Sequence, residues 1–174
     1  PMTARLTALN DNLRLRLAHI RTRFEYYAKV EGLSIELLNK LLASYEIHYQ
    51  NLRALHWNVK GIHFFELHQK YEELYSRTQL IIDEVAERIL TIGGIPLSRY
   101  SDYLSQSILK ENETISDGTR GVHYLVNAQM ELLELEKKVL SLTEQEADEG
   151  TNTLLSDLIR EKEKSNWMFS AWLG

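Results

Sequence analysis

The sequence contains no cysteine, and it has only 2 prolines and 8 glycines among its 174 residues. Without cysteine, disulfide frameworks and thiolate metal sites are excluded. Few prolines and glycines favour long helices over a turn-rich β fold. An apolar run of membrane-spanning length is also lacking, and residues 1–20 alternate leucine with arginine and asparagine, unlike a signal peptide. We therefore expect a helical protein of the cytoplasm, with no membrane partner.

The sequence also lacks an excess of positive charge. Lysine and arginine number 20 against 25 aspartates and glutamates, so the formal net charge is -5. Such a balance does not indicate a nucleic-acid-binding surface overall, although a local basic patch can still bind phosphate. The length suits one domain with a substantial core and is too short to suggest two.

Apolar residues recur at spacings of three, four and seven over four long stretches, which predicts four helices. These stretches cover residues 35–59, 64–92, 117–143 and the segment from about 151 onward. Gly61 and the Gly93–Gly94 pair mark the ends of the first two. The first connection is short, so these two helices are antiparallel neighbours, whereas residues 94–116 form a long crossover with a helical turn at 100–104. The pattern predicts an all-α, ferritin-like four-helix bundle over residues 34–174.

Residues 1–33 form a separate, basic extension with helical periodicity. Its apolar stripe consists of Leu6, Leu9, Leu13, Leu17, Ile20 and Phe24. Its basic residues are Arg5, Arg14, Arg16, Arg21, Arg23 and Lys29, set against Asp11, Glu25 and Glu31. One interpretation is a DNA-contacting arm that neutralises phosphates. We favour a fifth helix packed on the rest of the assembly or on a neighbour, because disordered DNA-binding tails lack a leucine stripe.

Imidazole and carboxylate side chains gather on the first two predicted helices in a pattern typical of iron, manganese or zinc sites. The candidate ligands are His56, His68, Glu72, Asp83 and Glu87. The turn near Gly61 lies midway between the two histidines, so an antiparallel hairpin brings both imidazoles to one level. Glu72 follows His68 by four residues, and Asp83 and Glu87 form a second i, i+4 pair.

Geometry divides this ligand set between two chains. His68 and Asp83 are fifteen residues apart, or about 22 Å along a straight helix, whereas a metal–ligand bond is only about 2.0–2.2 Å long. Both pairs point to the same side, because their angular offset is about 60°. Two copies that cross antiparallel about a two-fold axis bring His68 of one chain opposite Asp83 of the other. The spacing therefore predicts two identical metal sites per dimer.

Structural interpretations of the same residues remain open at this point. The acidic residues also fit a solvated helix face, on which Glu84 and Arg88 form an i, i+4 ion pair. The remaining histidines are interpreted as packed or solvent-facing residues; they are His19, His48, His63 and His123.

The segment from Asn51 to Asn58 contains His56 and Trp57, and it is followed by Gly61, Phe64–Phe65, Leu67–His68 and the run from Asp83 to Arg88. This combination resembles the Dps family, the DNA-protecting mini-ferritins of starved bacteria, over roughly residues 35–174. The resemblance implies a ferroxidase centre at a two-fold interface, built from the four matching ligands His56, His68, Asp83 and Glu87. Glu72 departs from the aspartate that is common there. Trp57 matches a tryptophan that takes up an oxidising equivalent beside the site; alternatively, it packs at the dimer seam.

The resemblance further implies a shell of twelve subunits that oxidises Fe(II), typically with hydrogen peroxide in preference to dioxygen. Fe(III) is then stored as a mineral, and DNA is protected from oxidative damage. Four acidic residues, here called the junction acids, lie where family members line three-fold pores: Glu144, Glu146, Asp148 and Glu149. Alternatively, Asp148 and Glu149 complement the N-terminus of the last helix. Thr153 stands where many relatives carry another acid.

Three rival functions are weighed against this one. Other di-iron bundles use Glu-x-x-His pairs within one subunit, and none of the 6 histidines here has a glutamate three residues before it. A non-enzymatic, DNA-compacting or structural shell is expected to have a flexible lysine-rich tail, which this sequence lacks. A member specialised for zinc or manganese is not separated by sequence, because imidazole–carboxylate sites select poorly among such ions. DNA binding is expected to be weak, and the bacterial nucleoid is an alternative location.

Overall fold

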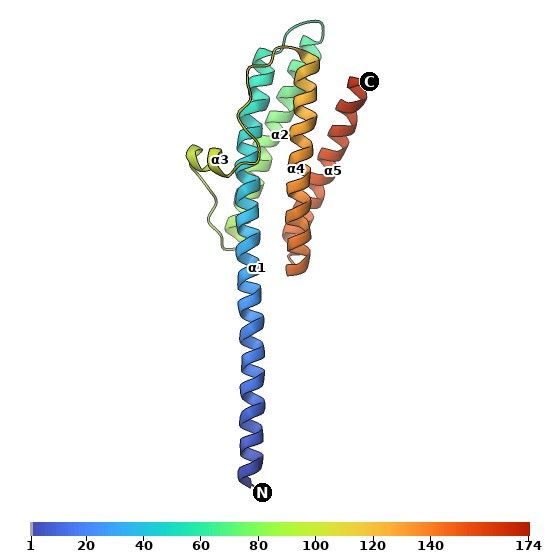
Figure 1. Cartoon of the computed structure of the whole chain (residues 1–174). Helices are drawn as coiled ribbons and strands as arrows, with labels where there is room; N and C mark the ends of the chain where they lie inside the picture. The colour runs from blue at the N-terminus through green and yellow to red at the C-terminus, as the bar shows by residue number, and fades with distance from the viewer. Residues whose placement is uncertain (1) are drawn as a thin grey trace. The chain divides into compact units, whose positions relative to one another are not determined.

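The computed structural model describes residues 2–174, and for residues 2–11, 24 and 26–31 the description is limited to the backbone. The helices are α1 (Met2–Asn58), α2 (Phe64–Thr91), α3 (Tyr100–Gln106), α4 (Gly118–Glu146) and α5 (Glu149–Leu173). By its internal contacts the chain divides into two units, one up to Leu33 and one from Ser34 to Gly174. In the second unit, α2, α4, α5 and the part of α1 from Ser34 onward form a four-helix bundle, and α3 lies in the long crossover (Figure 1). The predicted fold class is confirmed.

The N-terminal extension is helical, as predicted, but it is not a separate fifth helix. Residues 2–33 are the first part of α1, which continues to Asn58 without interruption. The expected boundary near residue 34 contains Gly32 and no proline, and one glycine costs a helix only about 1 kcal/mol. In the part of the extension with described side chains, Leu13, Leu17 and Ile20 are 52%, 64% and 62% exposed. The side chains of Arg5, Leu6, Leu9, Asp11, Phe24, Lys29 and Glu31 lie outside the described residues.

The apolar stripes of α1, α2 and α4 form the bundle core, which confirms the periodicity of the sequence. The fully buried large side chains include Leu38, Tyr45, Leu52, Leu67, Tyr71, Leu125 and Leu132. The stripe proposed for α5 is only partly correct, because Leu158 is buried but Met168 is 49% exposed. Past Lys162, the side chains of α5 are half-buried or exposed. Among the described residues, no helix is long and apolar enough to cross a membrane.

A short, well-anchored turn joins α1 to α2. Gly61 has a φ of +98°, a conformation that glycine adopts without steric cost, and its carbonyl accepts a hydrogen bond from Phe64 N at 3.1 Å. Lys60 N donates to Ser116 O at 2.9 Å, so the turn is tied to the segment that precedes α4. These bonds fix the level at which the end of α1 faces the start of α2.

The α4–α5 junction is held by an ion pair with α2. Ala147 adopts the left-handed conformation at the end of α4, and the Asp148 carboxylate caps α5 by accepting from Thr151 N at 3.0 Å. Arg88 Nη2 lies 2.5 Å from Asp148 Oδ1, and Arg88 Nε donates to Thr151 Oγ1 at 2.9 Å. The suggested Glu84–Arg88 pair does not form: Glu84 instead pairs with Arg77 at 2.8 Å.

A polar cluster, formed by Tyr45, His48, Glu136 and Lys162, is buried inside the bundle. Tyr45 donates its hydroxyl hydrogen to Glu136 Oε1, and Lys162 Nζ lies 3.5 Å from the same oxygen and 4.9 Å from the Tyr45 ring centroid. Burial raises the pKa of Glu136, although Lys162 and Tyr45 oppose this shift. Burial and the charge of Lys162 lower the pKa of His48 to about 3. The charged groups of this cluster are thus paired, because an isolated charge is costly to bury in an apolar interior.

Candidate metal centre

The two histidines that the sequence placed at one level do lie face to face. His56 is in the last turn of α1 and His68 is near the start of α2. Their ring centroids are 3.7 Å apart with an interplanar angle of 19°. His56 is buried, with 8% exposure, and His68 is half-buried. The hairpin therefore brings the two imidazoles together, as predicted from their spacing.

Each imidazole is held by the main chain of the other histidine. His56 Nδ1 lies 2.7 Å from His68 O, and His68 Nδ1 lies 2.8 Å from His56 O. A carbonyl oxygen only accepts, so Nδ1 carries the hydrogen in both rings. The Nε2 lone pair of each neutral ring is then available to a metal, and such Nδ1–H bonds fix the tautomer and orientation of ligand histidines. The residues present fit an imidazole-ligated metal.

Aromatic side chains enclose this pair on two sides. The Phe64 ring stacks on His68 at 4.9 Å and 25°, and the Tyr75 ring meets His56 edge-on at 5.3 Å. Burial, and next the negative charge of Glu72, raise the pKa of Tyr75, which places the Glu72 carboxylate near the phenol. Glu72 is thus close to the ring that contacts His56, although its own side chain is exposed.

Trp57 is exposed by 57% and does not pack into the core of its own chain. Its ring is covered on one face by the Arg53 guanidinium, whose central carbon lies 4.7 Å from the ring centroid. Arg53 also contacts the Tyr49 ring at 5.3 Å, and Tyr49 meets Tyr75 at 6.1 Å. Trp57 is thus linked through Arg53 and Tyr49 to Tyr75, the ring that contacts His56, and its exposed part is open to a neighbouring molecule.

Asp83 and Glu87 are exposed on α2, far along the helix from the histidines. Fifteen residues separate His68 from Asp83, which corresponds to about 22 Å in the continuous helix α2. Within the described part of the chain, no three histidine, aspartate or glutamate side chains converge on a common metal position. The structure of one chain thus brings His56 and His68 together and leaves the two carboxylates apart from them.

The junction acids differ from one another in their surroundings. Asp148 caps α5 and pairs with Arg88; burial alone would raise the pKa of its carboxyl, but the hydrogen bonds from Thr151 and the charge of Arg88 outweigh this effect and lower it. Glu146 Oε1 accepts from Ser34 Oγ at 2.6 Å, whereas Glu144 and Glu149 are exposed. The helix-capping alternative therefore holds for Asp148.

Several features of the centre were not anticipated from the sequence. The reciprocal imidazole–carbonyl bonds involve backbone oxygens, which every residue has, so residue types do not predict them. The aromatic contacts had a weak signal, because Phe64 and Tyr75 precede and follow His68 by four and seven residues, spacings that place them on one helix face. Of the other histidines, His48 is buried, His63 pairs with Glu66 at 2.8 Å, and His19 and His123 are exposed.

Comparison with known proteins identifies the family of this chain. The family model described as "Ferritin-like domain" matches residues 35–174. DNA protection during starvation protein 2 of Bacillus anthracis is 40% identical over 143 residues, which cover 80% of this chain and 96% of that protein. The DNA protection during starvation protein of Porphyromonas gingivalis is 36% identical over 135 residues, covering 78% and 85%.

Solved structures agree with the sequence matches. The crystal structure of a Dps protein from Vibrio cholerae O1, described as a member of a broad superfamily of ferritin-like diiron-carboxylate proteins, superposes with a TM-score of 0.82 at 44% identity. The match covers 84% of this chain and 92% of that one. A Dps protein from Bacillus brevis gives a TM-score of 0.82 at 34% identity, covering 84% and 98%. The chain belongs to the Dps family of ferritin-like proteins.

Proposed function

We propose that this protein is a ferroxidase and iron-storage shell whose di-iron sites are shared between two subunits. The observation that carries the proposal is the His56–His68 pair, in which both Nδ1 atoms are bonded to backbone carbonyls, so that among the described residues both Nε2 atoms remain available to a metal. Two imidazoles oriented in this way supply two of the ligands of a metal site. Iron storage and DNA protection are the roles that membership of this family supports.

A second subunit supplies the missing carboxylates in this proposal. Asp83 and Glu87 are exposed, and the length of α2 keeps them from their own histidines. Two α2 helices that cross antiparallel about a two-fold axis place the carboxylates of each chain opposite the histidines of the other. Glu72, near Tyr75, would reach the metal directly or through water. The sites number two per dimer, and the family resemblance supports a dodecamer.

The chemistry requires two one-electron oxidations per peroxide. Two Fe(II) ions each lose one electron, and hydrogen peroxide takes both electrons and two protons to give two water molecules. Carboxylates favour the higher charge of Fe(III), because hard oxygen anions stabilise hard cations. In this scheme Asp83 and Glu87 make the oxidation of Fe(II) to Fe(III) more favourable, while His56 and His68 bind the substrate ion. Trp57 is exposed. It would give up an electron to the oxidant when iron does not supply it.

Protection of DNA follows from the same reaction. Fe(II) and hydrogen peroxide together generate hydroxyl radicals, so a shell that consumes both and stores Fe(III) removes the damaging species. The relative from Bacillus anthracis is named for DNA protection during starvation. Dioxygen is the alternative oxidant, and single-turnover oxidation with each oxidant under matched conditions determines which of them this protein prefers.

The sharing of the site is tested by complementation between two inactive variants. One carries His56→Ala with His68→Ala, and the other carries Asp83→Ala with Glu87→Ala. A hybrid interface has one complete site and one site that lacks all four substituted ligands, so random co-assembly at equal amounts should restore about a quarter of the wild-type oxidation rate. His123→Ala with Glu131→Ala, exposed positions on α4, is the matched control and should retain full activity.

The outcomes separate the proposal from its alternatives. Hybrids that assemble and remain fully inactive would refute a shared site. Activity of either double variant alone would place the reaction elsewhere. Tight binding of Zn(II) or Mn(II) at the same ligands without Fe(II) oxidation would identify a member specialised for another metal.

A further inference from the structure

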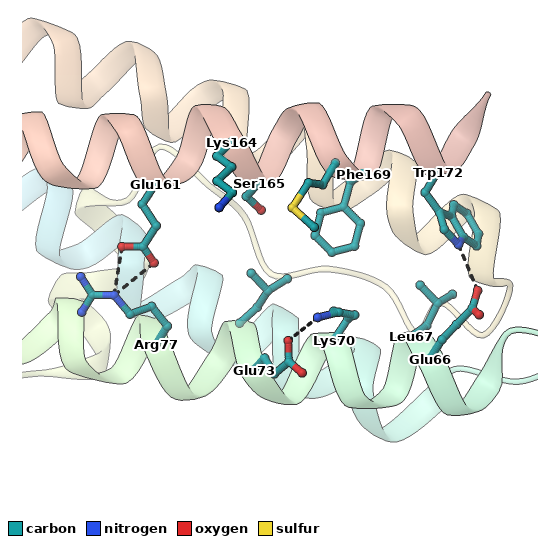
Figure 2. A pocket seen from close by; sticks show the side chains of 12 residues that line it. Glu66, Leu67, Lys70, Glu73, Arg77, Glu161, Lys164, Ser165, Phe169 and Trp172 are labelled. Carbon is teal, nitrogen blue, oxygen red and sulfur yellow. Dashed lines mark hydrogen bonds and ion pairs between the residues drawn. The ribbon is translucent and has the colours of Figure 1, made fainter.

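A groove of about 480 Å³ lies between α2 and α5, apart from the histidine pair. Its floor is apolar and consists of Leu67, Leu74, Met168, Phe169 and Trp172. Figure 2 shows Leu67 on α2 and Phe169 and Trp172 on α5 pointing into the space between the two helices. Pockets that bind small molecules have this size and this mixture of apolar walls and few polar groups.

The groove is closed at both ends by contacts between the helices. At one end Trp172 Nε1 donates to Glu66 Oε1 at 3.0 Å. At the other end Arg77 Nε lies 3.1 Å from both carboxylate oxygens of Glu161. Figure 2 shows these two bridges on either side of the apolar floor. Glu66 and Arg77 are eleven residues apart, so the groove extends over roughly 16 Å of α2. A continuous helix from another chain does not fit between such ends, whereas a short molecule does.

The positive charges on the rim differ in whether a described residue pairs with them. Lys70 pairs with Glu73 at 2.6 Å, and Arg77 pairs with Glu84 and Glu161. Lys164 forms no ion pair with any described residue, and it lines the groove beside Ser165. Figure 2 shows both side chains extending from α5 toward α2.

Ser165 adds an unused hydrogen-bond donor at the same place. Its Oγ is buried and has no hydrogen-bond partner among the described residues, and buried hydroxyls without a partner cost free energy. Glu66 lies at the opposite end of the groove, where its carboxylate accepts a hydrogen bond from Trp172. Trp172 follows Lys164 by eight residues, which is about 12 Å along α5. An ammonium and a hydroxyl at one end of an apolar groove match a carboxylate that carries an apolar body.

We propose that this groove binds a small monocarboxylate with an apolar chain or ring. The carboxylate accepts hydrogen bonds from Lys164 Nζ and Ser165 Oγ, and the apolar body lies on Met168 and Phe169 toward Trp172. Charge-assisted hydrogen bonds are about twice as strong as neutral ones, so the head group sets the orientation. The exposed part of Met168, at 49%, becomes covered, and its flexible thioether adapts to different chain shapes.

The test compares three probes with one apolar chain and different head groups on the full-length protein: octanoate, 1-octanol and octylamine. Titration calorimetry should give saturable binding of octanoate at one molecule per subunit, about tenfold tighter than 1-octanol. Octylamine should bind more weakly than 1-octanol, because Lys164 repels its ammonium group. Lys164→Gln should reduce the affinity for octanoate to that for 1-octanol, and Lys164→Arg should preserve the preference. Ser165→Ala should weaken only octanoate binding.

Control variants distinguish specific binding in the groove from nonspecific binding to the surface. Lys60→Gln, at an exposed lysine of the α1–α2 turn, should leave all three affinities unchanged, and Met168→Glu should weaken the binding of octanoate and 1-octanol. Equal affinity of the native protein for octanoate and 1-octanol, or a preference that survives Lys164→Gln, would overturn the proposal. A change of oligomer mass in Met168→Glu would also overturn it, because the groove would then be covered by a second copy.

Discussion

Acidification should destabilise the bundle through His48. This side chain is 2% exposed, and its Nδ1 has no hydrogen-bond partner among the described residues. It faces a small cavity that is also lined by Lys162, Arg77 and Glu161. Burial and the charge of Lys162 lower the pKa of His48 from 6.5 to about 3. The folded chain therefore holds this imidazole neutral, whereas the unfolded chain protonates it below pH 6.5.

The sign and size of the effect follow from proton linkage. Because the folded pKa lies below the unfolded value, the folded state binds fewer protons in the interval between them. The stability that neutral His48 contributes is complete above pH 6.5 and is lost as pH falls toward 3. At pH 5 the loss amounts to about 2 kcal/mol, since each pH unit below 6.5 costs about 1.4 kcal/mol.

The assay measures thermal unfolding by circular dichroism from pH 5 to 8 for the native protein and for His48→Gln. Subunit concentration is held constant, because assembly shifts apparent stability. The native protein should lose more stability than the variant between pH 8 and 5, by about 2 kcal/mol per subunit. His19→Gln, at an exposed histidine, serves as the control and should behave as the native protein does. Parallel pH profiles for native protein and His48→Gln would refute the reasoning.

Three further predictions concern other charged groups. Lys162→Met should destabilise the subunit by about 3–5 kcal/mol, because Glu136 loses its buried counterion; adding Glu136→Gln should restore most of this in denaturant unfolding. Glu144→Gln with Glu149→Gln, at the two exposed junction acids, should slow Fe(II) uptake at low ionic strength but not in high salt, and equal stopped-flow rates at low salt would exclude a role in iron entry. Gel shifts at near-physiological salt should show weak or no DNA binding, because a charge of -5 repeats on every subunit. Strong retardation that disappears on deleting residues 1–30 would instead make the extension a DNA-binding arm.

The bundle and its hairpin were predictable because their signals are local. The spacing of apolar residues indicated which face of each helix is buried, and Gly61 and Gly93 lie within three residues of the observed helix ends. No proline or other stop signal stands near residue 34, so α1 continues there as one helix, although the internal contacts of the chain do divide between Leu33 and Ser34. The apolar spacing failed in the second half of α5, because Met168 and Trp172 follow the stripe and yet line an open groove.

For the candidate centre, the sequence predicted that the two histidines lie at one level, but not how their rings are oriented. A hairpin with a central turn brings His56 and His68 to one level whatever the surrounding sequence is. Their rotation about χ1 and χ2 depends on backbone carbonyls of the opposite helix, and residue identity carries no information about that. The pairing of Arg88 with Asp148 across 60 residues was likewise hidden, because the i, i+4 partner Glu84 offered a plausible local alternative.

The contact between Arg88 and Asp148 has a consequence for cations that approach α2. Arg88 follows the candidate ligand Glu87 directly in the chain, and an unpaired guanidinium there would repel Fe(II) from that carboxylate. The Asp148 carboxylate, whose pKa is lowered on balance, stays ionised and cancels this charge down to acidic pH. In the proposed site, the Asp148 carboxylate that caps α5 would therefore also neutralise the positive charge beside Glu87 on α2. Asp148→Asn should weaken cation binding at Glu87 even though residue 148 is not itself one of the proposed ligands.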